Sequence, residues 1–297
     1  MKSSAIASAA LLAATLFSAP LYAQEIKVPT QTVDAALRAK LPKEILDAGE
    51  IISVNNGSFP PYEIVTDTRS LTGASADLAH AIGEVLGIKM RHESVSGLSG
   101  MLAGIKSGRY QMGIGPTGDF PDRQAANDFV DFVQEYVVFA VQKGNPKNIQ
   151  SLDDTCGARI AVMSGGSAER VIKQQAESCT KAGKPAIEVQ SFADQPTSIL
   201  AVRSKRSDAF FSSQAPLTYF IQQSNGELEL AAVGKSNGFE DLFQGTVVPK
   251  GSVLGEVILG AYQKLFANGT YAAIMKKWGL ENNMLKAPGI NLAGKKQ

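Results

Sequence analysis

The sequence has 297 residues and a nearly balanced charge, with 29 Lys and Arg against 28 Asp and Glu. That length can bury one large core or two medium ones, and the balance excludes the basic surface typical of nucleic-acid-binding proteins. The two histidines and two cysteines fit no metal-ligand spacing. We therefore expect no nucleic-acid partner, no metal and no cofactor.

The N-terminus has the layout of a secretory signal peptide. One lysine precedes an apolar run at 11–17, and the small residue Ala23 follows. The run is too short to cross ~30 Å of hydrocarbon comfortably. We predict a signal peptide over residues 1–23 and a mature protein in the periplasm. No cysteine follows the run to carry a lipid.

The first half of the mature chain alternates strands and helices. The expected elements are a helix within 33–46, a strand at 51–54, a helix and a strand within 71–90, and a helix and a strand within 100–116. The helix within 71–90 carries an apolar face made of Leu78, Ile82, Val85 and Leu86. This order predicts an α/β fold with a mainly parallel sheet and helices on its faces.

The pattern restarts after VQKGNPKNI. The expected elements are a strand at 158–163, a helix at 168–178, a strand at 187–189, a helix at 195–204, strands at 208–212 and 245–251, and helices within 254–269 and 270–280. We predict two lobes joined by two crossovers, near 139–145 and 243–251. Lobe 1 then comprises residues 24–141 and 247–297, and lobe 2 comprises residues 142–246.

The stretch GIGPTG at 113–118 has the G-x-G-x-x-G spacing of dinucleotide-binding loops. NAD is scarce outside the cytoplasm, which conflicts with an exported protein. Pro116 and Pro121 also restrict the helix that should open after the last glycine. We therefore reject a dinucleotide site.

The chain resembles the extracellular solute-binding proteins of family 3, the periplasmic amino-acid-binding components of ABC importers. Stretches with the family's order and spacing extend over nearly all of the mature chain: SFPPYE, LTGASADLAHAIGEVLG, IKSGRYQMGIG, DFPDRQAANDFVDF, SLDDTCGARIAVMSGGS, RSDAFF and NGTYAAIMKKWG. The resemblance implies the two-lobed periplasmic-binding-protein fold, with the ligand in the cleft between the lobes and closure about a hinge.

The resemblance also implies a set of ligand contacts. A guanidinium presents two parallel donors to a carboxylate, which suits Arg123. Small residues at 115–118 and 165–167 let a ligand approach the backbone, and two aromatic residues match the wall that covers the ligand. We expect these contacts from Asn56, Phe59, Tyr62, Gly115, Pro116, Gly118, Arg123, Met163, Gly166, Ser167 and Ser213.

One half of the family's site is altered. Ser213 stands where the family has an Asp that pairs with the ligand's α-ammonium group, and Asn56 stands where an acid often sits. A neutral serine cannot neutralise a buried cation. The ligand is then an acid without a free primary amine or a modified amino acid, unless Glu135 or Asp119 supplies the charge.

Cys156 and Cys179 are the only cysteines. In an exported chain two cysteines most simply form one disulfide, and the same pair occurs in a branch of the family. We predict a Cys156–Cys179 disulfide in the second lobe, remote from the ligand.

We predict a monomeric periplasmic solute-binding protein without catalytic activity. It captures a small carboxylate ligand (an amino acid, a modified amino acid or an amine-free organic acid) and delivers it to the membrane subunits of an ABC importer. The alternative is a periplasmic enzyme of the cyclohexadienyl dehydratase type, which needs a proton donor in the cleft. Acids are missing at the inferred cleft positions, and neither His80 nor His92 lies in an inferred ligand loop.

Overall fold

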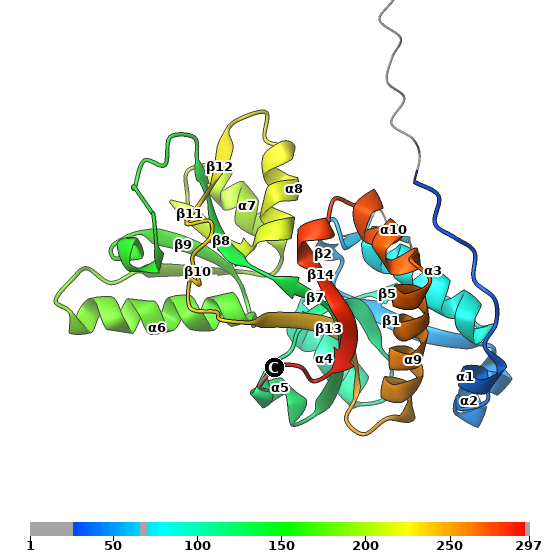
Figure 1. Ribbon diagram of the computed structural model, residues 1–297. Coiled ribbons are helices and arrows are strands. Elements are labelled where there is room, and N and C mark those ends of the chain that lie inside the picture. The colour runs from blue at the N-terminus through cyan, green and yellow to red at the C-terminus, as the bar shows by residue number, and fades with distance from the viewer. Residues whose placement is uncertain (1–25, 66–69, 295–297) are drawn as a thin grey trace, which may run out of the picture.

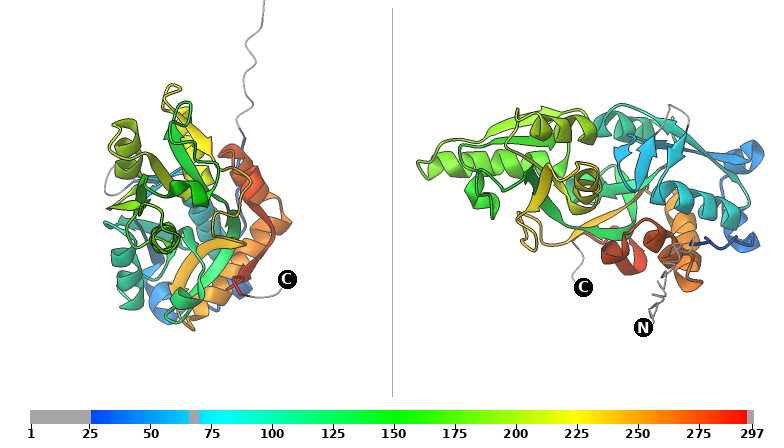
Figure 2. Two further views of the ribbon diagram at one scale, coloured as in Figure 1. Left: turned by 90° about the vertical axis from the view of Figure 1, so that its left-hand side faces the viewer. Right: turned by 90° about the horizontal axis from the view of Figure 1, so that it is seen from above.

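The computed structural model describes residues 26–65 and 70–294, which form two lobes joined by extended strands (Figure 1). The predicted signal peptide, residues 1–23, lies outside the described residues. Figure 2 shows the two lobes side by side along the long direction of the molecule. Within the described ranges, no helix is both long and apolar enough to span a bilayer. The predicted two-lobed α/β fold is confirmed.

Lobe 1 contains both ends of the described chain. Its strands are β1 (Glu50–Asn55), β2 (Ser58–Phe59), β3 (Glu63–Val65), β4 (Leu71–Thr72), β5 (Lys89–Ser94), β6 (Gly113–Gly118), β7 (Asn127–Glu135), β13 (Leu242–Pro249) and β14 (Met284–Ile290). Its helices are α1 (Ala35–Arg38), α2 (Lys43–Ala48), α3 (Ala74–Leu86), α4 (Leu98–Lys106), α5 (Pro121–Gln124), α9 (Val253–Ala267), α10 (Thr270–Lys277) and the 3₁₀ turn η2 (Glu281–Asn283).

Lobe 2 is one continuous stretch of chain. Its strands are β8 (Val137–Gln142), β9 (Arg159–Met163), β10 (Glu188–Phe192), β11 (Ala209–Ser213) and β12 (Leu228–Ala231). Its helices are the 3₁₀ turn η1 (Leu152–Thr155), α6 (Ser167–Lys181), α7 (Gln195–Arg203) and α8 (Gln214–Gln222).

The sheet of lobe 2 is mixed and lobe 1 has separate parallel and antiparallel sheets, whereas the sequence predicts mainly parallel ones. In lobe 2, β10, β9 and β11 are parallel, and β8 and β12 are antiparallel to their neighbours. In lobe 1, β1 and β5 are parallel, while β6, β13, β7 and β14 pair antiparallel. In lobe 1, β7 leads the chain toward lobe 2 and β13 brings it back. These two strands run in opposite directions and therefore pair antiparallel.

The chain leaves lobe 1 at Tyr136, between β7 and β8, and returns between β12 and β13. There Leu242 of β13 pairs with Glu135 of β7. The strand β8 lies in the lobe 2 sheet and β13 in the lobe 1 sheet, so both crossovers come earlier in the chain than the sequence predicts. One residue joins β7 to β8, and neither glycine nor proline occurs between residues 124 and 143, so no turn signal marks where the chain changes sheets.

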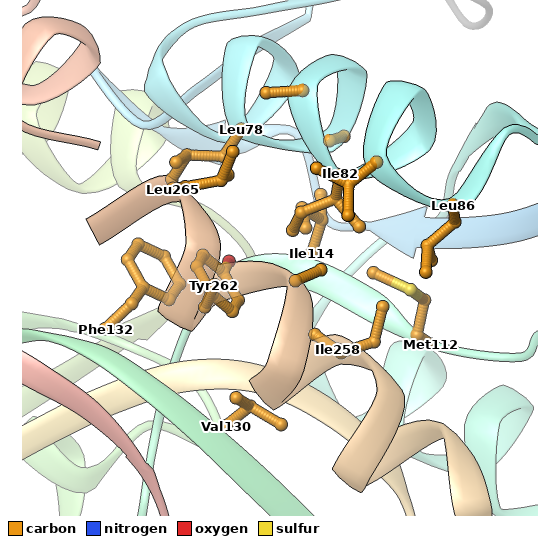
Figure 3. Packing of buried hydrophobic residues seen from close by; sticks show 14 of the residues in the cluster. Leu78, Ile82, Leu86, Met112, Ile114, Val130, Phe132, Ile258, Tyr262 and Leu265 are labelled. Carbon is orange, nitrogen blue, oxygen red and sulfur yellow. The ribbon is translucent and has the colours of Figure 1, made fainter. Parts of the chain in front are cut away.

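The core of lobe 1 lies between its helices and the strands β6 and β7 (Figure 3). The predicted apolar face of α3 is buried, with no side chain more than 1% exposed. It packs with Ile258, Tyr262 and Leu265 of α9 in one cluster. This packing holds fixed the strand ends at which the site is built.

The loop between β2 and β3 is fixed on the N-terminus of α3. The backbone N–H groups of Ala74 and Ser75 donate to the carbonyl oxygens of Pro61 (3.0 Å) and Tyr62 (2.9 Å). These bonds satisfy donors that have no partner within a helix. The loop can come this close to the helix only because residue 73 is glycine. Gly73 has φ +113°, and a Cβ atom there would lie 2.3 Å from the Tyr62 oxygen.

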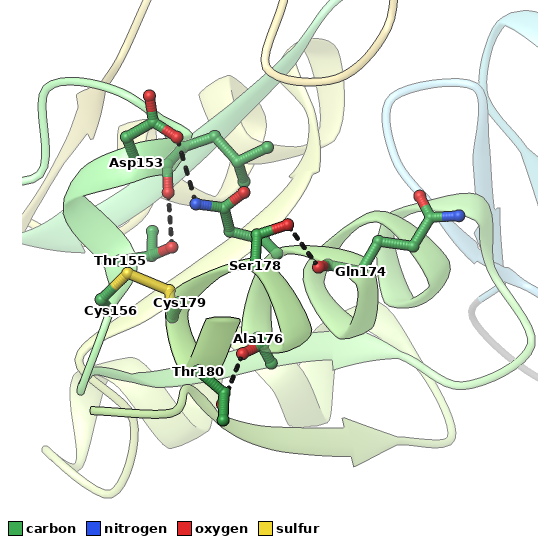
Figure 4. The surroundings of a disulfide bond; sticks show 10 residues. Asp153, Thr155, Cys156, Gln174, Ala176, Ser178, Cys179 and Thr180 are labelled. Atoms are coloured by element: carbon green, nitrogen blue, oxygen red, sulfur yellow. Dashed lines mark hydrogen bonds between the residues drawn. A yellow bond between two sulfur atoms is a disulfide. The ribbon is translucent and has the colours of Figure 1, made fainter. Parts of the chain in front are cut away.

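The predicted disulfide between Cys156 and Cys179 is confirmed (Figure 4). It joins the chain just after η1 to the last turn of α6, across 23 residues of sequence. Around it, hydrogen bonds are local, such as Thr155 to the Leu152 oxygen at 2.6 Å. The bond therefore closes a small region at the far side of lobe 2.

Replacing both cysteines by alanine should lower the free energy of unfolding of lobe 2 by about 3 kcal/mol, since the closed loop restricts the unfolded chain. Neither cysteine lines the cavity described below, so ligand affinity should not change. Urea unfolding of the wild type and the double variant measures the difference. An unchanged midpoint, or two reactive thiols in the unfolded and unreduced protein, would contradict this prediction.

Candidate ligand-binding site

A small cavity, here called the interlobe cavity, lies where the two lobes meet, and its volume is about 70 Å³. Residues of both lobes and of the hinge strands line it: Asn56, Phe59, Glu63, Leu98, Met101, Pro116, Thr117, Gly118, Arg123, Val137, Met163, Gly166, Ser167, Ala168, Gln195, Ser212, Ser213, Leu242 and Gln244. All of the predicted ligand residues except Tyr62 and Gly115 are in this lining. Residues far apart in the sequence are thus brought together.

Arg123 connects the two lobes at the edge of the cavity. Its Nη1 donates to the Gly118 oxygen at 2.9 Å, and its Nη2 donates to the Gly165 oxygen at 3.3 Å. The guanidinium carbon also lies 5.1 Å from the centre of the Phe120 ring. Burial lowers the pKa of Arg123 to about 10, so the group is still a cation at neutral pH.

No carboxylate of the described residues lies within ion-pair distance of Arg123. Asp122 and Asp119 attract the guanidinium only from a longer distance. A half-buried cation without an anion is costly. The arrangement is therefore suited to an anion from outside the protein.

The stretch at 113–118 forms the wholly buried strand β6, whereas the sequence predicts that the strand gives way to a ligand loop at 115–118. Its glycines make room for side chains of the site. A Cβ atom at Gly118 would lie 2.5 Å from the Phe120 ring, and one at Gly115 would lie 2.1 Å from the Glu63 carboxylate. The glycines of the G-x-G-x-x-G pattern thus admit protein side chains.

Lobe 2 contributes the start of α6 and the end of β11. Ser167 is the first residue of α6, where the helix dipole is positive. The backbone N–H of Gly165 already donates to Glu169 Oε2 at 2.7 Å, so part of the predicted anion cradle is taken by the protein. Ser213 ends β11, is 6% exposed and faces the cavity without supplying charge.

Tyr62, predicted to cover the ligand, lies outside the lining of the interlobe cavity. Its side chain is fully buried, and its hydroxyl donates to Glu135 Oε1 at 2.7 Å. The ring packs against Phe59, with centroids 5.7 Å apart, and only Phe59 reaches the cavity. Tyr62 ends the turn before β3 and its hydroxyl is bound to Glu135, whereas the Glu63 carboxylate lies against Gly115.

Glu63 is the site residue that the sequence interpretation missed. It is 5% exposed, lines the interlobe cavity, and its Oε1 atom has no hydrogen-bond partner. Burial raises the pKa of Glu63 to about 8, so the carboxyl group is neutral at pH 7. Acids are indeed missing at positions 56 and 213, but Glu63 places an acid at a position that the sequence interpretation did not consider. An acid flanked by Tyr62 and Ile64 in a short apolar strand was the available signal.

The two other acids considered from the sequence lie elsewhere. Asp119 accepts from Gln124 Nε2 at 2.7 Å and from the Ala293 N–H at 2.9 Å. Glu135 faces a second, larger cavity of about 640 Å³ on the other side of the hinge, and burial raises its pKa to about 7. Neither residue lines the interlobe cavity.

Size alone favours the second cavity, because sites for small molecules commonly measure about 300–1,000 Å³. Its charged residues other than Glu135 are Lys235 and Glu240, which are exposed to solvent. The interlobe cavity instead combines a buried acid and a half-buried cation, both without ionic partners. We therefore take the interlobe cavity as the candidate site, with the lobes close together around it.

The sequence model of the bacterial extracellular solute-binding proteins, family 3, matches residues 51–281. The chain belongs to this family. The Arginine-binding protein ArgT of Corynebacterium glutamicum is 25% identical over 260 residues, covering 86% of this chain and 82% of that protein. The L-cystine-binding protein TcyJ of Escherichia coli is 24% identical over 240 residues, covering 80% of this chain and 85% of that protein.

A solved structure of the same fold is that of the ancestral amino acid-binding protein AncCDT-1, described as a precursor of cyclohexadienyl dehydratase. It superposes with a TM-score of 0.69 at 20% identity, covering 79% of this chain and 97% of that one. The two named relatives of this family 3 protein are binding proteins for amino acids.

Proposed function

We propose that this family 3 protein captures one small carboxylate ligand in the interlobe cavity and delivers it to the membrane subunits of an ABC importer in the periplasm. The observation that carries the proposal is Arg123, a half-buried guanidinium without an ionic partner at the edge of a cavity lined by both lobes. A carboxylate would accept two parallel N–H bonds from it. The amino-acid ligands of the named relatives support the same class of ligand.

Ligand exchange requires the lobes to separate. The cavity of about 70 Å³ is far smaller than the usual volume of a ligand site. Over residues 26–65 and 70–294, the chain crosses between the lobes only at Tyr136 and in the segment between β12 and β13. Rotation there would open the site without unfolding either sheet. Capture by hinge closure needs no covalent step.

Native mass spectrometry of the purified protein tests the proposal first, because a tightly bound ligand survives purification. Calorimetric titration then follows with L-arginine, L-cystine, the other L-amino acids, and their 2-oxo and 2-hydroxy acid analogues. We expect at least one of these carboxylates to bind with one-to-one stoichiometry. The absence of binding by every carboxylate in the set, together with no retained ligand, would refute the proposal.

A dehydratase on the same scaffold is the second candidate function. The observation that favours it is Glu63, a neutral carboxylic acid in the cleft that could donate a proton to a leaving group. Incubation with prephenate or arogenate distinguishes the two functions. A dehydratase forms an aromatic product, whereas a binding protein returns the added compound unchanged.

A further inference from the structure

The interlobe cavity has two ionisable side chains, the acid Glu63 and the base Arg123, and no other titratable residue lines it. Neither forms an ion pair with the other or with any other described residue. Arg123 is engaged by the Gly118 and Gly165 carbonyl oxygens, and Glu63 Oε1 has no partner at all. The cavity therefore presents one group for an anion and a separate group for a cation.

The position of Glu63 depends on the strand opposite it. Its carboxylate lies against Gly115 of β6, where the Cβ of any other residue would be 2.1 Å from Oε1. The next residue, Pro116, has no N–H to offer the carboxylate. The neighbouring Tyr62 directs its hydroxyl to Glu135, away from this cavity. Space is made for the acid, but the protein supplies no donor to its Oε1 atom.

We propose that Glu63 binds the ammonium group of the ligand, in place of the acid that Ser213 does not supply. This inference rests on the proposed function, and it narrows the ligand class to molecules that carry both a carboxylate and an amine. It replaces the hypothesis of an amine-free acid drawn from Ser213. An acid without an amine would leave the Glu63 carboxyl group protonated and its buried Oε1 atom without a hydrogen-bond partner, which costs free energy.

The ionisation of Glu63 gives the inference a second readout. In the empty cavity burial keeps Glu63 protonated below about pH 8. Pairing with an ammonium group favours the carboxylate, so binding releases a proton. Affinity for an amino acid should then rise with pH from about 6 to about 8, by up to about tenfold per pH unit for one released proton. A 2-hydroxy acid should show neither effect.

Calorimetry of the mature protein at pH 6, in two buffers of different ionisation enthalpy, measures affinity and proton release together. The probes are each L-amino acid and the 2-hydroxy acid with the same side chain. We expect the best amino acid to bind at least ~30-fold more tightly than its hydroxy analogue, on the scale of losing one partner of a buried charge pair. Binding of the amino acid should release up to one proton, and binding of the hydroxy acid should release none.

The variant Glu63→Gln keeps the size of the side chain and removes its charge. It should abolish the proton release and lower amino-acid affinity by a similar ~30-fold, while leaving hydroxy-acid affinity unchanged. The matched control is Glu135→Gln, a buried glutamate outside the interlobe cavity, which should retain the proton release. If Glu63→Gln fails to fold, Gly115→Ala displaces the carboxylate instead and should give the same loss.

The outcomes separate this inference from the proposed function. If amino and hydroxy acids bind equally well, and the wild type and Glu63→Gln release the same number of protons, Glu63 is not the ammonium site, although carboxylate capture stands. If neither class of acid binds, the proposed function fails and the inference fails with it. Loss of affinity without loss of proton release in Glu63→Gln would also overturn the inference.

Discussion

The variant Arg123→Ala should lose the ligand's carboxylate clamp and bind its best carboxylate ligand more weakly by about 2–5 kcal/mol. The physical reason is that the ligand's carboxylate would be desolvated in the cavity without a cation to receive it. Removing the side chain also removes the bond from Nη2 to the Gly165 oxygen, a contact between the two lobes. Calorimetric titration of both proteins with the same ligand measures the difference.

Arg170 is the matched control for this experiment. Its guanidinium also lies over the Phe120 ring, at 5.3 Å, but it pairs with Asp122 and is outside the lining of the interlobe cavity. Arg170→Ala should leave affinity nearly unchanged. Arg123→Lys keeps the charge but loses the paired donors, so it should fall between the other two. Equal affinity in wild type and Arg123→Ala would contradict the assigned role.

Gly73→Ala should destabilise lobe 1 by about 4 kcal/mol or more, which is a large effect for one methyl group. At φ +113° the new Cβ would lie 2.3 Å from the Tyr62 oxygen and 2.6 Å from the Pro61 oxygen. Both are backbone atoms, so no side-chain rotation can relieve the contact. The loop that carries Phe59 and Glu63 would have to leave the N-terminus of α3, and ligand affinity should fall as well.

Gly97 is the control position that separates the cost of backbone strain from the cost of a steric clash. It also precedes a helix and has positive φ, +76°, but a Cβ there would meet nothing within 4 Å. Gly97→Ala should therefore cost only the backbone strain of a conformation that is nearly specific to glycine, φ +76° with ψ 152°, which is about 1–3 kcal/mol. Chemical denaturation of the two variants compares them. Similar losses would show that the Tyr62 and Pro61 carbonyls do not restrict Gly73.

For the site, sequence reasoning selects residues that have a distinctive chemical use. Arg123, Gly118 and the start of α6 were selected because donors and small residues are needed around a carboxylate, and they line the interlobe cavity. Their contact with a ligand stays a prediction. The same reasoning missed Glu63, because it considered acids only at the family's positions, 213 and 56, and at Glu135 and Asp119. The room for Glu63 is created by Gly115 on another strand, and that pairing exists only in three dimensions.

For the fold, the amphipathic helices were predictable and the hinge strands were not. The face of α3 is visible in the sequence because its other face meets solvent. The strands β7 and β8 are buried on both sides, and they are separated by the single residue Tyr136. No turn residue marks the junction, and the predicted crossover at 139–145 therefore begins three residues after Tyr136.

The order of the strands in each sheet also determines which lobe can finish folding first. All strands of lobe 2 lie between residues 137 and 231, so its sheet needs only one continuous stretch. In lobe 1, β7 lies between β13 and β14, and the bond from Gln134 to Asp241 spans 107 residues. A chain emerging from its N-terminus leaves both edges of β7 open until these last strands arrive, an exposure that favours aggregation. The lobe that carries Arg123 and Glu63 is therefore the last to become whole, and truncation before β13 would remove binding while sparing lobe 2.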